Sequence, residues 1–349
     1  MNALWKPHSR ASLAFPLALL ALLLVSVLAL AACGGGNTAS GTAPSAASPS
    51  STASPSPAVS AASLPSALPR QTYPGTLVFT RITRPNRNYD ICLVRSDGTG
   101  LRRLTDDPGV EGHAYWSPDG RQIVYDVYTP GHGGVWVMNA NGSGKRELVG
   151  GGACLAHWSP DGRQIVYLGG GGISVVDADG RDNTCLVAFA SGRVTGAVDI
   201  MQKPVANPCW TPDGRIVFFS GWPSADLYVV NPDGSGLARL TKSAGLSEPA
   251  VSPDGTRVAA YVRGKDRIVS VPLNGDAAPV TLLGHARRYF PSGGVPIAAW
   301  TQDGRKLVLG GSMFGETRGS GLYIVNADGS GLKRIPHVTH AVCANWRPR

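Results

Sequence analysis

Three side chains capable of binding or acid–base chemistry stand at one position of a repeated motif. His113, Asn207 and Glu248 each lie three residues before the first residue of that motif. If the repeats surround an axis, an imidazole, an amide and a carboxylate converge there and form a pocket for a polar ligand. The plainer interpretation is that they line a water-filled channel and bond to one another. Acid–base catalysis would require His113 and Glu248 to meet on a substrate with shifted pKa values.

Repeated aspartates give a second pattern that could do chemistry. Asp119, Asp161 and Asp213 each stand between Pro and Gly, and a ring of such carboxylates could attract a cation. Turn chemistry explains them without a metal, since Pro presets φ at the first corner, Asp suits the second and Gly accepts a positive φ. We therefore expect no metal site and no cofactor.

Cysteine chemistry is left open by the sequence. Apart from Cys33, the chain has five cysteines, an odd number, and their spacing does not determine any disulfide pairing. They are Cys92, Cys154, Cys185, Cys209 and Cys343. The sequence contains no Cys-x-x-Cys, no His-Glu-x-x-His and no Gly-x-Ser-x-Gly motif, so we do not expect an enzyme.

Arginines concentrate in the loops near the two ends of the repeated region. If these ends are neighbours, up to six guanidinium groups share one sector, which predicts a surface for an acidic partner or polyanion; an ordinary solvated rim is the alternative. The six are Arg81, Arg84, Arg87, Arg287, Arg288 and Arg318.

A motif of about five residues positions these groups and recurs at spacings of 41 to 52 residues. It begins at Trp116, Trp158, Trp210, Val251 and Trp300, with a final Trp346. A period of this length with short strand signals and no helical periodicity is typical of β-propeller blades. The tryptophans are expected to pack between blades rather than stack on a ligand.

Each unit predicts four antiparallel strands. After the motif comes a second strand such as 123–125, then a variable loop, a third strand such as 135–138, an Asn-Gly or Asp-Gly turn and an outer strand. Residues 75–104 supply strands two to four but no strand one, and residues 341–346 supply the missing strand. The prediction is an all-β, six-bladed propeller in which the carboxy-terminal strand pairs with the amino-terminal blade and closes the ring.

Strand alternation sorts the loops onto two faces. The repeated turns share one face, which we interpret as architecture. Loops of irregular length share the other, and variation there indicates a tailored surface, with His113, Asn207 and Glu248 at its channel mouth.

The Trp-Ser-Pro-Asp-Gly and Asp-Gly-Ser-Gly turns resemble those of the TolB-like propellers, which carry WD40-like (PD40) repeats. The resemblance covers residues 75–349 and implies a periplasmic or surface protein that binds other proteins. TolB itself has a small α/β domain before its propeller, whereas this chain has a Ser/Ala/Pro-rich segment there, so the role of TolB itself is not implied.

The amino terminus is a targeting segment. Lys6 and Arg10 precede an apolar run, and Leu30-Ala-Ala-Cys33 at its end resembles a bacterial lipobox. This predicts a signal peptide at 1–32 and lipidation of Cys33, with an uncleaved membrane anchor as the alternative. Residues 33–72 are then a disordered tether rich in Ser, Ala, Pro and Gly, and 73–349 the propeller.

Function is predicted from these parts together. The formal net charge is +9, but basic residues are scattered rather than clustered on a helix, which does not favour nucleic acid. We expect a monomeric lipoprotein on the extracytoplasmic side of a bacterial cell membrane that binds an envelope protein or an anionic polymer. The alternatives are a carbohydrate-active or peptidase-like enzyme with a site at the channel mouth, and a purely structural subunit of an envelope complex.

Overall fold

The computed structural model describes residues 75–348 apart from 84–87, 130–131, 170, 189–197, 200–204, 222–224, 243, 263, 274–278, 291–296 and 312–320. The Cys33 and tether predictions, and those for Arg84, Arg87 and Arg318, lie outside these residues. Of the helices formed by the described residues, none has the length and apolar character that spanning a bilayer requires.

The described residues form an all-β structure of mostly four-stranded antiparallel groups. One eight-stranded sheet consists of two such groups, joined by a single parallel pair between Tyr89 and Val110. The first group contains β25 (Ala341–Trp346), β1 (Thr76–Thr83), β2 (Asn88–Arg95) and β3 (Arg102–Arg103). The second contains β4 (Val110–Trp116), β5 (Gln122–Thr129), β6 (His132–Asn139) and β7 (Arg146–Val149).

Four further sheets follow in chain order. The first has β8 (Cys154–Trp158), β9 (Gln164–Gly169), β10 (Gly172–Asp177) and β11 (Thr184–Ala188), with β12 (Val198–Asp199) added in parallel. The next has β13 (Val205–Trp210), β14 (Ile216–Ser220), β15 (Asp226–Val230) and β16 (Ala238–Arg239). Then come β17 (Leu246–Val251), β18 (Arg257–Val262), β19 (Arg267–Pro272) and β20 (Val280–Leu283). The last has β21 (Ile297–Trp300), β22 (Lys306–Gly310), β23 (Tyr323–Asn326) and β24 (Lys333–Arg334).

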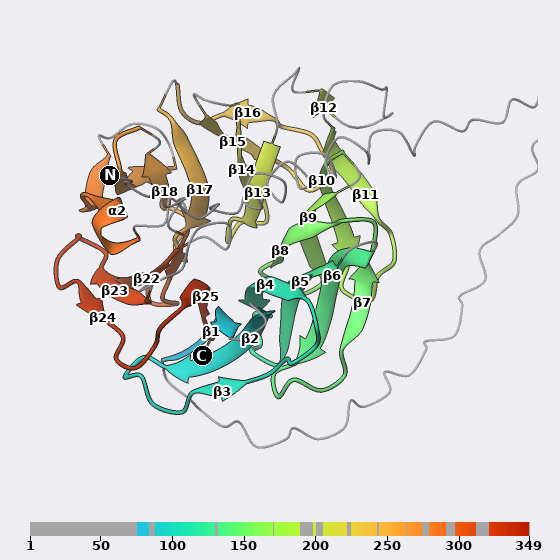
Figure 1. Cartoon of the computed structure of the whole chain (residues 1–349). Helices are drawn as coiled ribbons and strands as arrows, with labels where there is room; N and C mark the ends of the chain where they lie inside the picture. The colour runs from blue at the N-terminus through green and yellow to red at the C-terminus, as the bar shows by residue number, and fades with distance from the viewer. Residues whose placement is uncertain are drawn as a thin grey trace, which may run out of the picture.

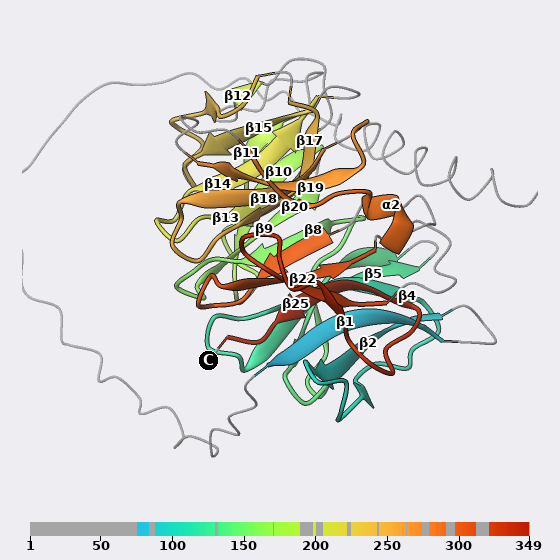
Figure 2. The ribbon, with the colours of Figure 1, turned by 90° about the vertical axis from the view of Figure 1, so that its left-hand side faces the viewer.

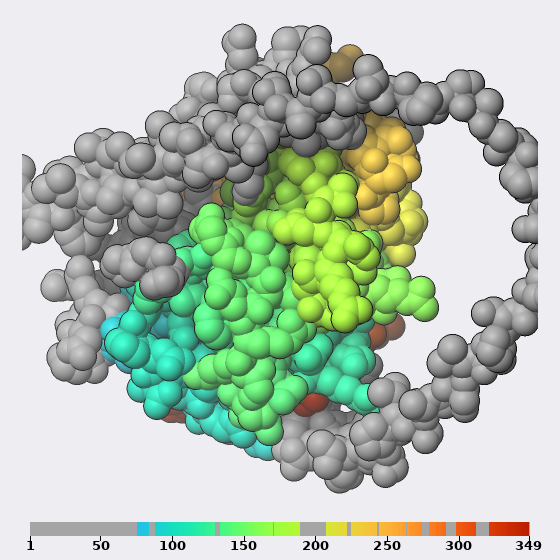
Figure 3. Space-filling model, turned by 90° about the vertical axis from the view of Figure 1, so that its right-hand side faces the viewer, coloured from blue at the N-terminus to red at the C-terminus, as the bar shows by residue number. Residues whose placement is uncertain are grey.

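These sheets lie around a common centre. Figure 1 shows β4, β8, β13, β17 and β25 nearest the middle and β3, β7, β16 and β24 toward the rim. The rim around β7 and β11 faces the viewer in Figure 3. The short helix α2 (Ala286–Tyr289) lies in one of the loops expected to vary, and Figure 2 shows it on the same side of the molecule as the end of β1.

The predicted pairing of the two chain ends is confirmed. β25 runs antiparallel to β1, with Leu77 opposite Trp346 and Arg81 opposite Ala341. Apolar residues of β1 and β2 pack with residues of β21 and β22 in one buried cluster, so the first and last parts of the repeated region are neighbours.

Turn chemistry holds the repeated motifs as expected. In the first of them Ser117 Oγ donates to Asp119 Oδ1 (2.6 Å), the Arg121 N–H donates to the same oxygen, and Gly120 has a φ of +65°. Asp161 makes the same bonds with Ser159 and the Arg163 N–H. Hydrogen bonding, chiefly from Ser159, lowers the pKa of Asp161. Local hydrogen bonds therefore account for these carboxylates.

The tryptophans pack between neighbouring groups, as predicted. Trp116 lies in a buried cluster with Val78 and Ile91 of the preceding group. In two places the indole also bonds across the boundary: Trp210 Nε1 donates to the His157 carbonyl (3.2 Å) and Trp300 Nε1 to the Ala250 carbonyl (2.9 Å).

Candidate functional site

The repeat position three residues before the motif has an unusual backbone conformation. In five groups its residue has a positive φ between 47° and 57°, and the strand pairing slips there. These residues are His113, Leu155, Asn207, Glu248 and Cys343. The strand β21, with Ile297 at this position, pairs with β22 without a slip. Left-handed conformations are unfavourable for side chains larger than glycine and cluster at functional sites.

His113, Asn207 and Glu248 line one central cavity of about 370 Å³. They reach it from β4, β13 and β17, three strands of different groups. The structure therefore places all three residues at one cavity.

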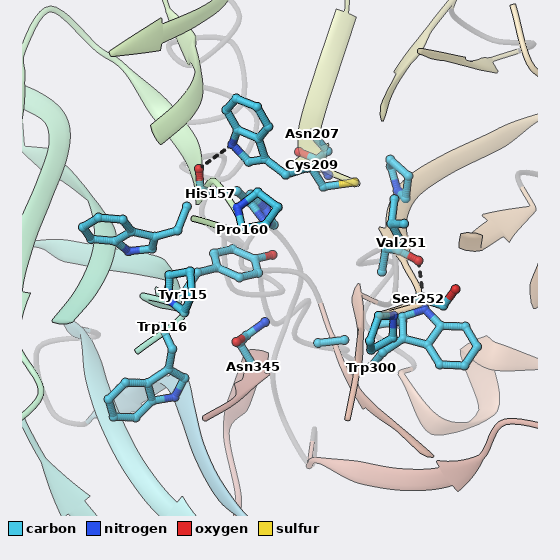
Figure 4. A pocket seen from close by; sticks show the side chains of 18 of the residues that line it. Tyr115, Trp116, His157, Pro160, Asn207, Cys209, Val251, Ser252, Trp300 and Asn345 are labelled. Carbon is cyan, nitrogen blue, oxygen red and sulfur yellow. Dashed lines mark hydrogen bonds between the residues drawn. The ribbon is translucent and has the colours of Figure 1, made fainter. Parts of the chain in front are cut away.

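A second ring of side chains lines the same cavity and was missed at the sequence level. Its members stand one residue before the motif and include Tyr115, His157, Cys209 and Asn345 (Figure 4). The signal was available, because a repeat places the residues of one motif position at equivalent points of neighbouring units. A search for polar residues at both positions would have found them.

The cavity also extends to the repeated turns. Its lining includes five prolines from the Ser-Pro, Thr-Pro and Arg-Pro corners of the motifs: Pro118, Pro160, Pro212, Pro253 and Pro348. These turns were expected to be architectural, with the binding surface on the opposite face. The cavity is therefore lined by residues of the turn side as well as by residues of the central strands.

His113 belongs to a buried polar network. Its Nδ1 lies 2.9 Å from Asp126 Oδ2, which also accepts from the Tyr128 hydroxyl (3.1 Å) and the Leu155 N–H (2.7 Å). Burial by itself would lower the pKa of His113, but Cys343 and Asp126 outweigh it and raise that pKa well above its usual value. A positive imidazolium at the cavity wall is thereby compensated by a carboxylate behind it.

The pKa of His157 shifts in the opposite direction to that of His113. Burial, together with the nearby charge of His113, lowers the pKa of His157 to about 3. The ring of Tyr115 lies against it with a centroid distance of 3.6 Å, and the phenol projects toward the middle of the cavity (Figure 4). Burial and nearby Cys343 and Glu248 raise the pKa of Tyr115 well above its usual value. This wall is therefore aromatic and uncharged at neutral pH.

Three of the six arginines predicted to form a surface lie among the described residues. Arg287 and Arg288 are exposed on α2, and Arg81 lies near the end of β1 on the same side (Figure 2). The Arg287 guanidinium lies 3.9 Å from Asp266, which reduces its local excess of positive charge.

All five cysteines within the described ranges are free thiols. Burial raises the pKa of Cys92 and of Cys209 to about 12 each, so neither ionises readily. Among the residues that the structure places, no group of three or more His, Cys, Asp or Glu side chains could hold a metal ion.

Comparisons with known proteins leave the sequence family open and settle the fold. No family model matches the chain, and no curated protein matches it. Among solved structures, TolB from Acinetobacter baumannii is similar with a TM-score of 0.64 and 16% identity, over 79% of this chain and 67% of that one. A protein described as a TolB from Agrobacterium tumefaciens has a TM-score of 0.52 and 17% identity, over 74% and 87%.

The fold is that of a TolB-like β-propeller. A structure from the nidogen/laminin complex is also similar, with a TM-score of 0.59 and 13% identity. The match covers 78% of this chain and 98% of that one. Identities this low carry the fold and not the activity.

Proposed function

We propose that this protein is a binding propeller, held on the extracytoplasmic side of a bacterial cell membrane by a lipid on Cys33. The propeller has six blades and is closed by the pairing of β25 with β1. The segment before residue 73 acts as a tether that lets it reach a partner in the envelope. Support for the anchor comes from the lipobox-like Leu30-Ala-Ala-Cys33 at the foot of an apolar run.

The observation that carries the binding function is the central cavity. His113, Asn207 and Glu248 line it together with tryptophans and prolines, and a concave, largely apolar wall with a few polar groups is typical of binding sites. The partner we expect is an envelope protein that inserts a side chain or chain end into this cavity. Arg287 and Arg288 favour a partner with an acidic flank.

In-cell photocrosslinking tests the site. A photoreactive amino acid is placed at Asn207 in the lipidated protein, and for comparison at Thr281, which is exposed on β20. We expect one discrete crosslinked product from position 207 and none from position 281, and the Glu248→Gln variant should reduce its yield. Equal labelling at both positions, or no product at position 207, would exclude the cavity as the binding site.

The anchor is tested separately. Metabolic labelling with an alkyne analogue of palmitate should label the wild type and leave Cys33→Ser unlabelled. A wild-type protein without label would contradict lipidation and leave the cavity test unaffected.

A further inference from the structure

The charged side chains that line the central cavity sum to a negative charge. Among the described residues of its lining, three are of types that can be charged near pH 7: His113, His157 and Glu248. Burial and the charge of nearby His113 lower the pKa of His157 to about 3, so that imidazole is neutral at pH 7. The charges that remain are the carboxylate of Glu248 and, when it is protonated, the imidazolium of His113.

The charge of His113 is compensated from behind the cavity wall. Its Nδ1 lies 2.9 Å from Asp126 Oδ2, and the two side chains are only 3% and 0% exposed. Asp126 is not itself one of the lining residues. The His113–Asp126 pair is neutral when His113 is protonated and negative when it is not. Glu248 therefore makes the total charge at the cavity negative in either state.

Oxygen acceptors stand around the same space. The phenol of Tyr115 points toward the middle of the cavity, and Asn207 and Asn345 lie on different sides of it (Figure 4). Burial, followed by nearby Cys343 and Glu248, raises the pKa of Tyr115 well above its usual value, so the phenol stays neutral and its oxygen can accept a hydrogen bond. An ammonium group has three donors and no acceptor, and a carboxylate, a phenol and two amides supply partners for all three.

The remaining wall suits an unbranched aliphatic chain. Tryptophans and prolines make up much of the lining, and Pro160, Pro212 and Pro253 belong to it while being exposed, so the lining extends to the solvent on the turn side. A lysine buries its four-carbon stem along such apolar surface while its ammonium reaches a polar group. The cavity of about 370 Å³ has room for one such side chain, since a cavity of ~150 Å³ already holds a benzene molecule.

The turns at this end of the cavity do not oppose the approach of a cation. The Arg163 and Asp161 side chains lie 4.0 Å apart, and the Arg215 and Asp213 side chains 2.8 Å apart, each pair within one turn. In each pair the positive and negative charges cancel. The net negative charge at the floor of the cavity is therefore not masked by an excess of positive charge in these turns.

We propose that the cavity binds the side chain of a lysine from the envelope protein that the propeller recognises, with its ammonium at Glu248 and hydrogen-bonded to Tyr115, Asn207 or Asn345. Because the site is that of the proposed binding function, the assignment rests on that function and adds the chemistry of the group that enters. Arginine fits less well, since a planar guanidinium has five donors in fixed directions to satisfy.

Blocked amino acids test this chemistry without the partner. N-acetyl-lysine methylamide is titrated into the purified full-length protein at pH 7, and binding is followed by ligand-observed NMR. The norleucine derivative has the same four-carbon chain without the ammonium, the glutamate derivative has the opposite charge, and the arginine derivative has the larger cation. We expect saturable binding of the lysine derivative with a Kd roughly tenfold or more below the other three. No saturation by the lysine derivative, or equal binding of any of the others, overturns the proposal.

Two variants locate the binding. Glu248→Gln should raise the Kd of the lysine derivative roughly tenfold or more, because hydrogen bonds to a charged group are about twice as strong as neutral ones. Glu147→Gln, exposed on β7, removes the same charge elsewhere and should leave the Kd unchanged. Asn207→Leu is the second variant, because Leu155 has the same left-handed conformation in another group; it should weaken binding of the lysine derivative and not of the norleucine derivative. Near-ultraviolet circular dichroism checks that the variants fold, and an unchanged Kd in folded Glu248→Gln contradicts the proposal.

The segment captured by crosslinking at position 207 separates this assignment from the function on which it rests. Mass spectrometry of the crosslinked product should find a lysine in the partner's segment. A crosslinked segment without lysine overturns the assignment and leaves the binding function standing. Binding of the lysine derivative with no crosslinked product in cells overturns the protein partner and leaves the lysine-selective chemistry of the cavity standing.

Discussion

Glu111→Gln should stabilise the protein above neutral pH and have little effect below pH 4.5. Glu111 lies on β4 opposite Val127 and is 2% exposed. Its Oε2 has no hydrogen-bond partner among the described residues. Burial raises the pKa of Glu111 from 4.5 to about 7; Thr105 and Lys145 oppose the rise, and Asp107 and Asp90 add to it.

The direction of the effect follows from linkage. Because the folded pKa is above the unfolded one, the folded state holds the proton more tightly, and that contribution is fully present below about pH 4.5. It is lost as the pH rises to about 7. A shift from 4.5 to about 7 corresponds to about 3 kcal/mol, since each pKa unit is worth ~1.4 kcal/mol. Relaxation of the protein around the buried charge reduces this, so we expect about 2 kcal/mol.

Denaturant unfolding at pH 4.5, 6 and 8 measures the effect. The free energy of unfolding of Glu111→Gln, minus that of the wild type, should increase by about 2 kcal/mol between pH 4.5 and pH 8. A constant cost of the new amide cancels in this comparison. Glu147→Gln, on the exposed side of β7, removes the same charge and controls for the change in net charge. A change below about 0.5 kcal/mol for Glu111→Gln would refute the reasoning.

Two further predictions concern the scaffold. Asp161→Ala should lower the free energy of unfolding by about 1 kcal/mol, because it removes the acceptor for Ser159 and the Arg163 N–H. Asp161→Asn keeps an acceptor and should lower the free energy of unfolding less. An equal loss in both variants would favour a role for the charge itself, and added calcium should not change the melting temperature of either variant. Gly172→Ala should destabilise by about 3 kcal/mol or more, since a Cβ would overlap the Val187 carbonyl oxygen. Gly284→Ala, where a Cβ meets nothing within 4 Å, should stay within about 0.5 kcal/mol; similar melting temperatures for the two variants would contradict the close packing of β10 on β11.

Local sequence determined the strands and turns of this protein. The second strand predicted at 123–125 lies within β5, the third strand at 135–138 within β6, and the carboxy-terminal strand at 341–346 coincides with β25. These features were predictable because they depend on short-range physics. Pro, Asp and Gly set a tight turn, and alternating apolar residues set a half-buried strand.

The partners of each functional side chain were decided only by the tertiary structure. Asp126 is 13 residues from His113, and the Leu155 N–H is 29 residues beyond Asp126, yet both groups contact the same Asp126 oxygen. Neither the left-handed bulge at His113 nor the proline-lined end of the cavity has a sequence signal of its own. Both arise because neighbouring sheets pack around a centre, which brings together residues that no local spacing connects.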